Sequence, residues 1–192
     1  MQTLVRAFAD DPVVNHLFPV PEIRARGMAH VFKMALRSAS RLGAMDVIPP
    51  DQAAAIWLQP EHPKPGLSQM FFAGALATPF LVGWQATRRM LGYERFVEEL
   101  RFQLMGGRPH WYLFAIGIEP GHQGRGLGST LLAAGRQRAT AGGFPCYLET
   151  SNERNLAFYR KNGFTVVDRR ELPGAHLNLW SLISEGTSGD TA

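Results

Sequence analysis

The stretch Trp111–Thr130, WYLFAIGIEPGHQGRGLGST, organises this chain. Its first part, Trp111–Ile118, is an unbroken apolar and aromatic run, which predicts a strand buried on both faces. A Glu-Pro-Gly turn ends that strand. Three glycines then fall within the five residues Gly124–Gly128, and the chain runs directly into a segment with helical spacing. The order is therefore strand, glycine-rich turn and helix.

This order is typical of a phosphate-binding site. Glycines let the backbone curl so that successive N–H groups point into one hollow, and the positive end of the helix dipole adds to that field. The residues expected on the buried face of the helix are Leu127, Leu131, Ala134, Gly135 and Ala139.

Two common phosphate motifs do not fit. A P-loop needs a lysine before the Ser or Thr that closes the turn, and here Ser129 follows Gly128 directly. A Rossmann fingerprint needs a different last glycine spacing and an acidic residue on a following strand. The pattern Gln123-x-x-Gly126-x-Gly128 therefore indicates a phosphate-containing ligand other than those bound by P-loop and Rossmann motifs.

Composition bounds the class of protein. The chain has 192 residues, of which 45% are hydrophobic, so we expect one domain with a proper core. No apolar run is long enough for a membrane span, and no secretion signal opens the chain. The single cysteine, Cys146, fits a reducing compartment, and we expect a cytoplasmic protein.

The charge balance suits an anionic ligand. The formal net charge is +4, with 17 arginines and three lysines scattered along the chain. Because no basic stripe with interleaved aromatic residues is present, we do not expect a nucleic-acid partner. We expect no membrane partner either.

The remaining elements follow from periodicity and from proline and glycine positions. The expected helices are Thr3–Phe18 with an interruption at Pro12, Glu22–Leu42, Leu67–Ala77, Thr87–Met105 and Asn152–Lys161. The expected strands are Ala44–Ile48, Ala53–Leu58, Pro145–Thr150 and the hairpin Phe164–Arg170 with His176–Ile183. Alternation of strands and helices in the second half predicts an α/β or α+β sheet domain.

Two blocks carry a family resemblance. The pattern Gln123-x-x-Gly126-x-Gly128 resembles the coenzyme A pyrophosphate loop of the GNAT N-acetyltransferase superfamily. Asn155, Tyr159 and Gly163-Phe164 resemble the second coenzyme A motif of the same enzymes. The strings HWYL, LETS, RNLAFY and GFTV, between His110 and Val167, look closest to the puromycin N-acetyltransferase branch.

The resemblance implies a GNAT-type fold, in which a mixed central sheet carries helices on both faces. The sheet is expected to splay open between the parallel strands Trp111–Ile118 and Pro145–Thr150. Family members usually carry a strand before the first helix, so the resemblance also implies that a first strand is missing. We expect a single domain over residues 1–184, and the Gly, Ser and Thr residues after Glu185 predict a flexible tail over residues 185–192.

The resemblance also implies direct acetyl transfer from acetyl-CoA to an amine. Tyr159 would protonate the departing thiolate, and Asn155 would bind the cofactor. The pantetheine arm would pair with the strand backbone, and the pyrophosphate would lie on the amides of the turn. The cofactor-binding residues so implied are Phe114, Ala115, Ile116, Gly117, Ile118, Gln123, Gly124, Arg125, Gly126, Leu127, Gly128 and Ser129.

The base that deprotonates the amine has three candidates. Glu149 ranks first because it lies at a strand end where the crevice should form, either as a base acting through water or as a binder of the cationic amine. His110 and Tyr112 are the other candidates.

The sequence therefore predicts an acetyl-CoA-dependent N-acetyltransferase acting on a small-molecule amine through a ternary complex. A protein lysine or N-terminal acetyltransferase is one alternative, and a catalytically silent coenzyme-A-binding sensor or partner module is another. No metal is expected, and a homodimer is left open.

Overall fold

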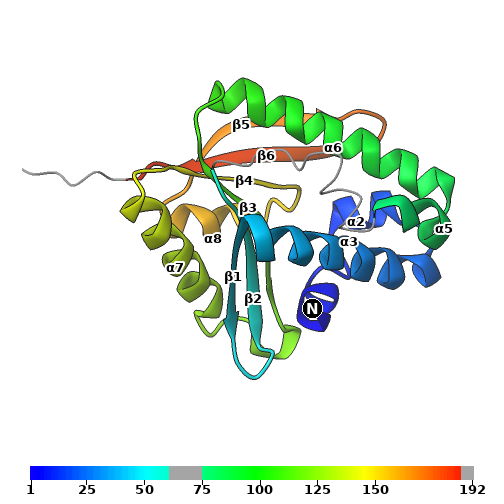
Figure 1. Ribbon diagram of the computed structural model, residues 1–192, viewed down its shortest axis with the longest axis horizontal. Coiled ribbons are helices and arrows are strands. Elements are labelled where there is room, and N and C mark those ends of the chain that lie inside the picture. Colours follow the sequence, from blue (N-terminus) through cyan, green and yellow to red (C-terminus); the bar gives the residue numbers. More distant parts are fainter. Residues whose placement is uncertain (61–74, 187–192) are drawn as a thin grey trace, which may run out of the picture.

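The computed structural model describes residues 1–60 and 75–186 of the chain. Within them one six-stranded mixed sheet runs in the order β1-β2-β3-β4-β6-β5 (Figure 1). Only β3 and β4 pair in parallel, and the other neighbours are antiparallel. The strands are β1 Gly43–Ile48, β2 Ala53–Leu58, β3 Trp111–Ile118, β4 Cys146–Thr150, β5 Thr165–Leu172 and β6 Leu177–Ser184.

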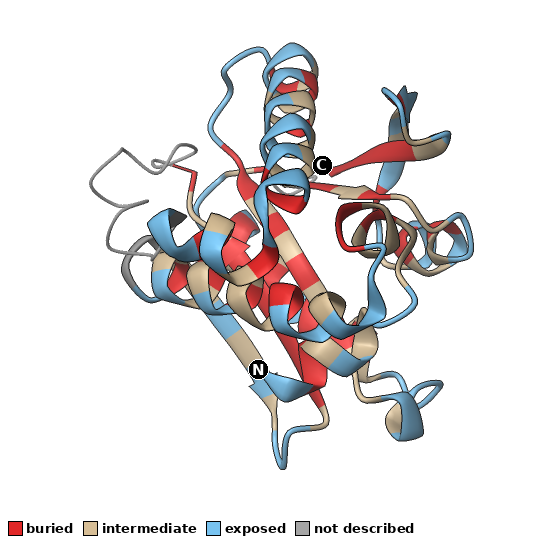
Figure 2. Ribbon diagram, turned by 90° about the vertical axis from the view of Figure 1, so that its right-hand side faces the viewer, coloured by how far each residue is buried: buried red, intermediate tan, exposed pale blue. Residues whose placement is uncertain are grey.

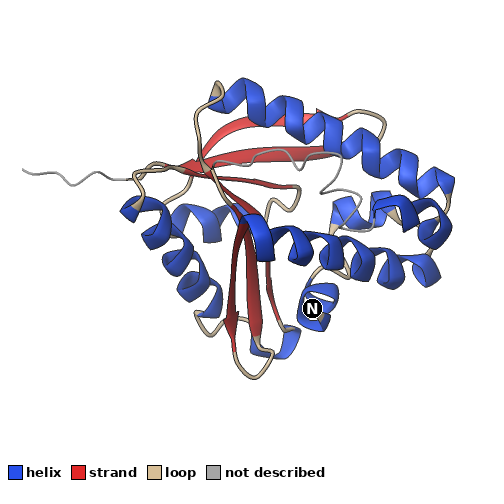
Figure 3. Cartoon of the chain, in the orientation of Figure 1, coloured by secondary structure: helices blue, strands red, loops and turns tan. Residues whose placement is uncertain are grey.

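Helices cover both faces of the sheet (Figure 3). The described α-helices are α1 Gln2–Ala7, α2 Pro12–Leu17, α3 Pro21–Leu42, α5 Thr78–Val82, α6 Trp84–Met105, α7 Leu127–Ala141 and α8 Asn155–Lys161. Short 3₁₀ helices span Ala75–Ala77 and Pro120–His122. The fold is the mixed, helix-covered sheet that the sequence predicts.

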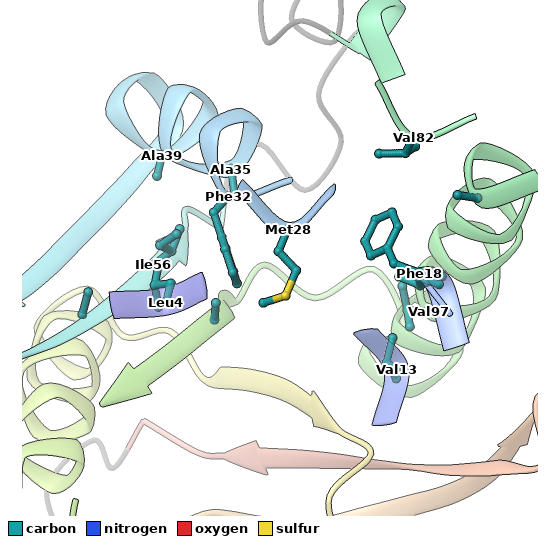
Figure 4. Packing of buried hydrophobic residues seen from close by; sticks show 14 of the residues in the cluster. Leu4, Val13, Phe18, Met28, Phe32, Ala35, Ala39, Ile56, Val82 and Val97 are labelled. Carbon is teal, nitrogen blue, oxygen red and sulfur yellow. The ribbon is translucent and has the colours of Figure 1, made fainter. Parts of the chain in front are cut away.

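Two large cores lie on the two faces of the sheet, and a small third cluster joins Met105, Tyr147 and Ile183. The first joins α1, α2, α3, α5 and α6 to side chains such as Ile56 and Leu179. Figure 4 shows part of it, where Phe32 and Met28 from α3 lie near Leu4. The second core joins α7 and α8 to the opposite face through Trp57, Trp111 and other residues. The sheet therefore separates an α6 side from an α7 side.

The sheet opens between β3 and β4. Their pairing is limited to Trp111 with Cys146 and Tyr112 with Tyr147, after which the strands diverge (Figure 1). A β-bulge lies just beyond this point, because Trp57 and Ile56 of β2 face Leu113 and Ala115, which leaves Phe114 as an extra residue. A bulge bends a strand and increases its twist. We attribute the opening of the sheet to this bulge.

The bulge also redirects side chains. Leu113 packs in the core on the α7 side, whereas both Phe114 and Ala115 pack on the α1 and α3 side. Ile116 returns to the α7 side. The expectation that β3 is buried on both faces is wrong, because its residues alternate between buried and half-buried. Because of the bulge, half-buried residues of β3 lie on both faces, with Phe114 on one side and Ile116 and Ile118 on the other.

Several predicted boundaries hold. The bounds of β2 and β3 are confirmed, and Pro12 does separate two helices, since Asp11 caps α2 through bonds from the amides of Val13 and Val14. The short helix α5 was not predicted. Ala134 was expected on the buried face of α7 but is exposed, and Leu132 takes that role with 0% exposure.

The predicted helix Leu67–Ala77 and the predicted tail 185–192 lie only partly within the described residues. The predicted helix Leu67–Ala77 lies outside the described residues except for its last three, which form a 3₁₀ helix. The expected tail begins at Glu185, but its carboxylate accepts two hydrogen bonds from Arg108 at 3.1 and 2.9 Å. Residues 187–192 lie outside the described part.

Gly135 allows α7 to lie close against the sheet. An ideal Cβ built at Gly135 would lie 2.2 Å from the Trp57 ring, and Trp57 is fully buried. Because a buried indole in a close-packed core has little room to move, a side chain at this position must push the helix away from the sheet.

We therefore expect Gly135→Ala to lower the free energy of unfolding by about 1–3 kcal/mol, the usual effect of overpacking. Gly92→Ala in α6 is the matched control, since nothing lies within 4 Å of a Cβ there and alanine favours the helix. Urea unfolding of both variants measures the effect. Equal stability of the two variants would contradict the packing argument.

Candidate functional site

A cavity of about 600 Å³ lies where the sheet opens. Its walls come from α1 and the residues after it, the end of β3, the glycine-rich turn, the start of α7, and α8 with the residues before it. Segments far apart in the sequence therefore share one cavity because the bulged strand β3 diverges from β4.

The glycine-rich turn forms one wall of the cavity. Gly124 and Gly126 have positive φ angles of 77° and 79°, which residues with a Cβ rarely adopt. Gly126 is the N-cap of α7, and the amide of Thr130 makes the first bond of the helix to its carbonyl at 3.1 Å. The preceding amides, through Ser129, have no acceptor within the helix. Free amides at a helix start can bind an anion, which is the role that the sequence predicts for this turn.

Gly128 holds the turn against α8. This glycine is buried, and a Cβ there would lie 2.9 Å from the ring of Phe158. The close contact brings the start of α7 next to the helix that carries Asn155 and Tyr159. One glycine therefore serves packing, whereas Gly124 and Gly126 serve backbone conformation.

Basic side chains contribute positive charge to the cavity. Arg154 and Lys161, at the two ends of α8, both line it. Arg125, which the sequence favours for phosphate contact, is exposed and is not among the described lining residues. Together with the helix amides, the two basic residues suit a ligand with several phosphate charges.

Tyr159 and Asn155 both line the cavity from α8. Tyr159 is 6% exposed, and its ring packs between Phe158 and Phe164 with centroids at 5.2 and 6.0 Å. Within the described part of the chain its hydroxyl has no hydrogen-bond partner. Burial raises the pKa of Tyr159 above its ordinary value of 10.0, and the charge of Asp11 adds to this. The phenol therefore stays protonated at neutral pH and can act as a proton donor.

Asn155 is free to contact a ligand. The turn before α8 is capped by Asn152, whose side-chain oxygen accepts the amide of Arg154 at 3.1 Å and whose carbonyl accepts the amide of Asn155 at 3.0 Å. Because Asn152 makes these bonds, capping does not engage the side chain of Asn155.

Glu149 lies on β4 near the opening of the sheet, and it does not line the cavity. Its Oε1 is buried and has no hydrogen-bond partner among the described residues. Burial raises the pKa of Glu149 to about 7, although the charge of Arg101 and the hydroxyls of Tyr112 and Tyr147 act to lower it. A carboxylate with this pKa can accept a proton near neutral pH.

The groups around Glu149 come from strands β3, β4 and β6 and from helix α6. The rings of Tyr112 and Tyr147 are 6.1 Å apart, and the guanidinium of Arg101 lies 4.4 Å from the centre of the Tyr112 ring. The hydroxyl of Tyr147 donates to Ser181 Oγ at 3.1 Å. These contacts fix the surroundings of the carboxylate on the α6 side of the sheet.

The other candidate bases fit less well. His110 is buried, its Nδ1 lies 2.8 Å from the carbonyl of Arg108, and burial lowers its pKa. Burial raises the pKa of Tyr112 well above 10.0, so this phenol is not ionised at neutral pH. Burial also raises the pKa of Cys146 to about 12, which argues against a reactive thiolate.

The cavity brings together most of the residues expected at the cofactor site. The expected residues that line it are Ile116, Gly117, Ile118, Gln123, Gly124, Gly126, Leu127, Gly128, Ser129, Asn155 and Tyr159. The expected residues not among its described lining are Phe114, Ala115, Arg125 and Glu149.

Sequence reasoning missed the contribution of α1 and of the basic residues on α8. Additional lining residues are Ala7, Phe8, Asp10, Asp11, His122, Asn152, Arg154, Phe158 and Lys161. Lys161 lies two positions after Tyr159, so the α8 motif itself offered a signal. Nothing in the sequence of α1 indicates that it packs beside β3.

Among the described residues, no group of three or more His, Cys, Asp or Glu side chains is placed to hold a metal ion. None of the described helices combines the length and the apolar character needed to cross a membrane.

Comparison with known proteins gives a family match. Residues 46–164 match the acetyltransferase (GNAT) family model. A mycothiol acetyltransferase of Saccharomonospora viridis is 32% identical over 96 residues, which are 48% of this chain and 31% of that protein. A mycothiol acetyltransferase of Nocardioides sp. is 39% identical over 59 residues, or 29% of this chain and 20% of that protein. The chain thus spans at most about a third of these two relatives.

A solved structure agrees over nearly the whole chain. It is described as histone acetyltransferase HPA2 and related acetyltransferase from Corynebacterium glutamicum, and it superposes with a TM-score of 0.69 at 22% identity. The match covers 98% of this chain and 90% of that chain. At this identity the likeness concerns the fold. GNAT acetyltransferases use acetyl-CoA, and the turn and the basic residues of the cavity suit its phosphates.

We expect Gly126→Val to weaken acetyl-CoA binding by about 100-fold or more, because a β-branched residue at a φ of 79° distorts the turn that presents the amides. Gly121→Val is the matched control, since Gly121 has no positive φ and nothing lies within 4 Å of a Cβ there. Isothermal titration calorimetry measures both affinities, and circular dichroism checks the fold. Unchanged affinity in Gly126→Val would remove the turn from the site.

Proposed function

This chain belongs to the acetyltransferase (GNAT) family, and from that premise we propose that it transfers the acetyl group of acetyl-CoA directly to the amine of a small molecule. The observation that carries the proposal is one cavity shared by the N-terminal amides of α7 and by the phenol of Tyr159. The same cavity thus offers an anion site and a proton donor that has no other described partner.

In the proposed reaction the amine nitrogen forms a bond to the acetyl carbon, and the carbon–sulfur bond breaks. Tyr159 donates its proton to the departing sulfur, and Glu149 takes a proton from the amine through water. An amide of the splayed segment Phe114–Ile118 donates to the carbonyl oxygen as negative charge develops there. The segment is available because β4 pairs with β3 only as far as Tyr112.

The pKa values favour these assignments. The pKa of Tyr159 lies above 10.0, so its phenol remains protonated at neutral pH. The pKa of Glu149 is raised to about 7, so its carboxyl group is largely ionised at pH 8. An acid and a base with separated environments are what general acid–base catalysis requires. Glu149 does not line the cavity, which is why we route its proton transfer through water.

Two likenesses support a small molecule as the acetyl acceptor. The two curated relatives described above are named for mycothiol, a small molecule. The resemblance of the strings HWYL, LETS and RNLAFY to puromycin N-acetyltransferases points the same way. We keep acetylation of a protein lysine or N-terminus as the alternative, and the acceptor is to be identified by an amine screen with thiol detection.

A silent cofactor-binding module is the alternative from a different class. Retention of Tyr159 and Asn155 beside the anion site argues against it. Binding of acetyl-CoA without thiol release from any small amine or peptide would favour the silent module.

We expect Tyr159→Phe to lower kcat by about 100-fold or more, the usual size of a general-acid contribution, with the dissociation constant of acetyl-CoA unchanged within about threefold. Because burial keeps the phenol protonated, kcat of the natural chain should show no fall up to about pH 10. Steady-state kinetics and calorimetry measure both. A kcat near that of the natural chain would exclude Tyr159 as the acid.

We expect Glu149→Gln to reduce kcat by about 100-fold and to remove the loss of activity that protonation of Glu149 causes below about pH 7. The same substitution should raise the free energy of unfolding above pH 7 even though it lowers kcat. Because folding raises the pKa of Glu149 from 4.5 to about 7, its ionisation destabilises the fold increasingly as pH rises through this range.

The Glu149→Gln variant should therefore have the same free energy of unfolding as the natural chain near pH 4.5. At pH 8 its free energy of unfolding should be higher by about 1–3 kcal/mol. Urea unfolding at the two pH values measures this difference. A variant that loses activity and also loses stability at pH 8 would mean that Glu149 has a structural role.

A further inference from the structure

The outer face of α6 carries a stripe of exposed apolar side chains. Trp84 is 75% exposed, Leu91 59% and Phe102 62%. They are separated by seven and eleven residues, which are close to two and three turns of helix, so all three share one face. The stripe runs the length of α6, which is about 33 Å for 22 residues.

The stripe has no cover from the described residues. Figure 1 shows α6 along the top edge of the molecule, and Figure 2 shows much of its outer surface as exposed. The opposite face of α6 packs into the core through Val97 and Leu100. In the adjoining helix α5, Phe80 is 90% exposed. Large apolar side chains gathered on one surface in this way mark an interaction site.

The exposed charges on the same face are Arg88, Arg95 and Glu99, and two of them, Arg88 and Glu99, are placed to pair with a second copy of α6. Arg88 and Glu99 are both exposed, and they are eleven residues apart, so they lie on the face of the stripe near its two ends. A two-fold axis through the middle of α6 places Arg88 of each copy opposite Glu99 of the other. The same axis places Trp84 of each copy near Phe102 of the other. It brings the two Leu91 side chains close to the centre, with the two exposed Arg95 side chains beside them.

We propose that two copies of this chain associate through antiparallel packing of their α6 helices, with Trp84, Leu91 and Phe102 as the apolar core and Arg88 and Glu99 as reciprocal ion pairs. A symmetric interface of this kind is self-complementary. Glu99 accepts a hydrogen bond from Gln103 at 2.7 Å within its own helix, and the carboxylate has a second oxygen for the arginine of the other copy.

The interface would lie on the outer face of α6, opposite the face that packs in the core. The inner face of α6 carries Tyr93, and Arg101 of the same helix lies over Tyr112 beside Glu149. Among the described residues, α6 contributes none to the lining of the cofactor cavity. Dimer formation would therefore restrict the motion of the residues around Glu149 without contacting the anion site. The proposal does not depend on which molecule accepts the acetyl group.

Light scattering after size exclusion tests the association. We expect the natural chain to give twice the 21.3 kDa mass of one chain at high concentration, with the fraction of dimer falling on dilution. Trp84→Asp should weaken association by about 30-fold or more, as the loss of a tryptophan buried in an interface does. Met45→Asp and Val167→Asp are matched controls, because both residues are exposed apolar side chains on edge strands of the sheet, and these variants should remain dimeric.

A charge exchange tests the antiparallel arrangement. Arg88→Glu alone and Glu99→Arg alone should each weaken self-association, because each creates two repulsive pairs across the axis. An equimolar mixture of the two variants should form a heterodimer, because every cross-pair is then attractive. Within one chain the two residues are about 16 Å apart along the helix, so the effect cannot arise in a single molecule.

Circular dichroism and acetyl-CoA binding confirm that each variant is folded. A natural chain that is monomeric at all accessible concentrations would overturn the proposal, as would a dimer unaffected by Trp84→Asp. If both charge variants are monomeric and their mixture stays monomeric, the antiparallel arrangement is wrong.

Discussion

The extra residue Phe114 in β3 is the constraint on which the site depends. Phe114 lies two residues beyond the last pair between β3 and β4, and past that pair β4 continues only with β6. An open sheet leaves backbone donors and acceptors of β3 without a strand partner, which is costly unless water or a ligand bonds them. The cavity is the place where such a ligand would satisfy them, so the binding site and the defect in the sheet have one cause.

The two faces of the sheet create different electrostatic environments for the proposed acid and base. Tyr159 lies in the aromatic packing of the α7 side, where burial keeps the phenol neutral. Glu149 is surrounded by tyrosines and Arg101, which offset part of the cost of burying its charge. Because the environment of each group sets its pKa, the fold itself separates a proton donor from a proton acceptor.

Local pattern was enough to predict the elements bounded by proline and glycine. The bounds of β2 and β3 were read from apolar runs that end in turn residues, and the glycine-rich turn was read from spacing. The bulge at Phe114 could not be predicted, because it is defined by pairing with β2. The positions of Asp11 and Arg154 in the cavity depend on how α1 and α8 pack against the sheet, which involves contacts distant in sequence.

Separate cores on the two faces limit how far the effect of a substitution spreads. The anion-binding turn, α7 and α8 pack in one core, whereas α6 and the helices of the N-terminal half pack in the other. Substitutions in cores that share few contacts combine almost additively. Substitutions around α6 can therefore alter the packing of one face of the sheet with little effect on the stability of the face that carries the glycine-rich turn.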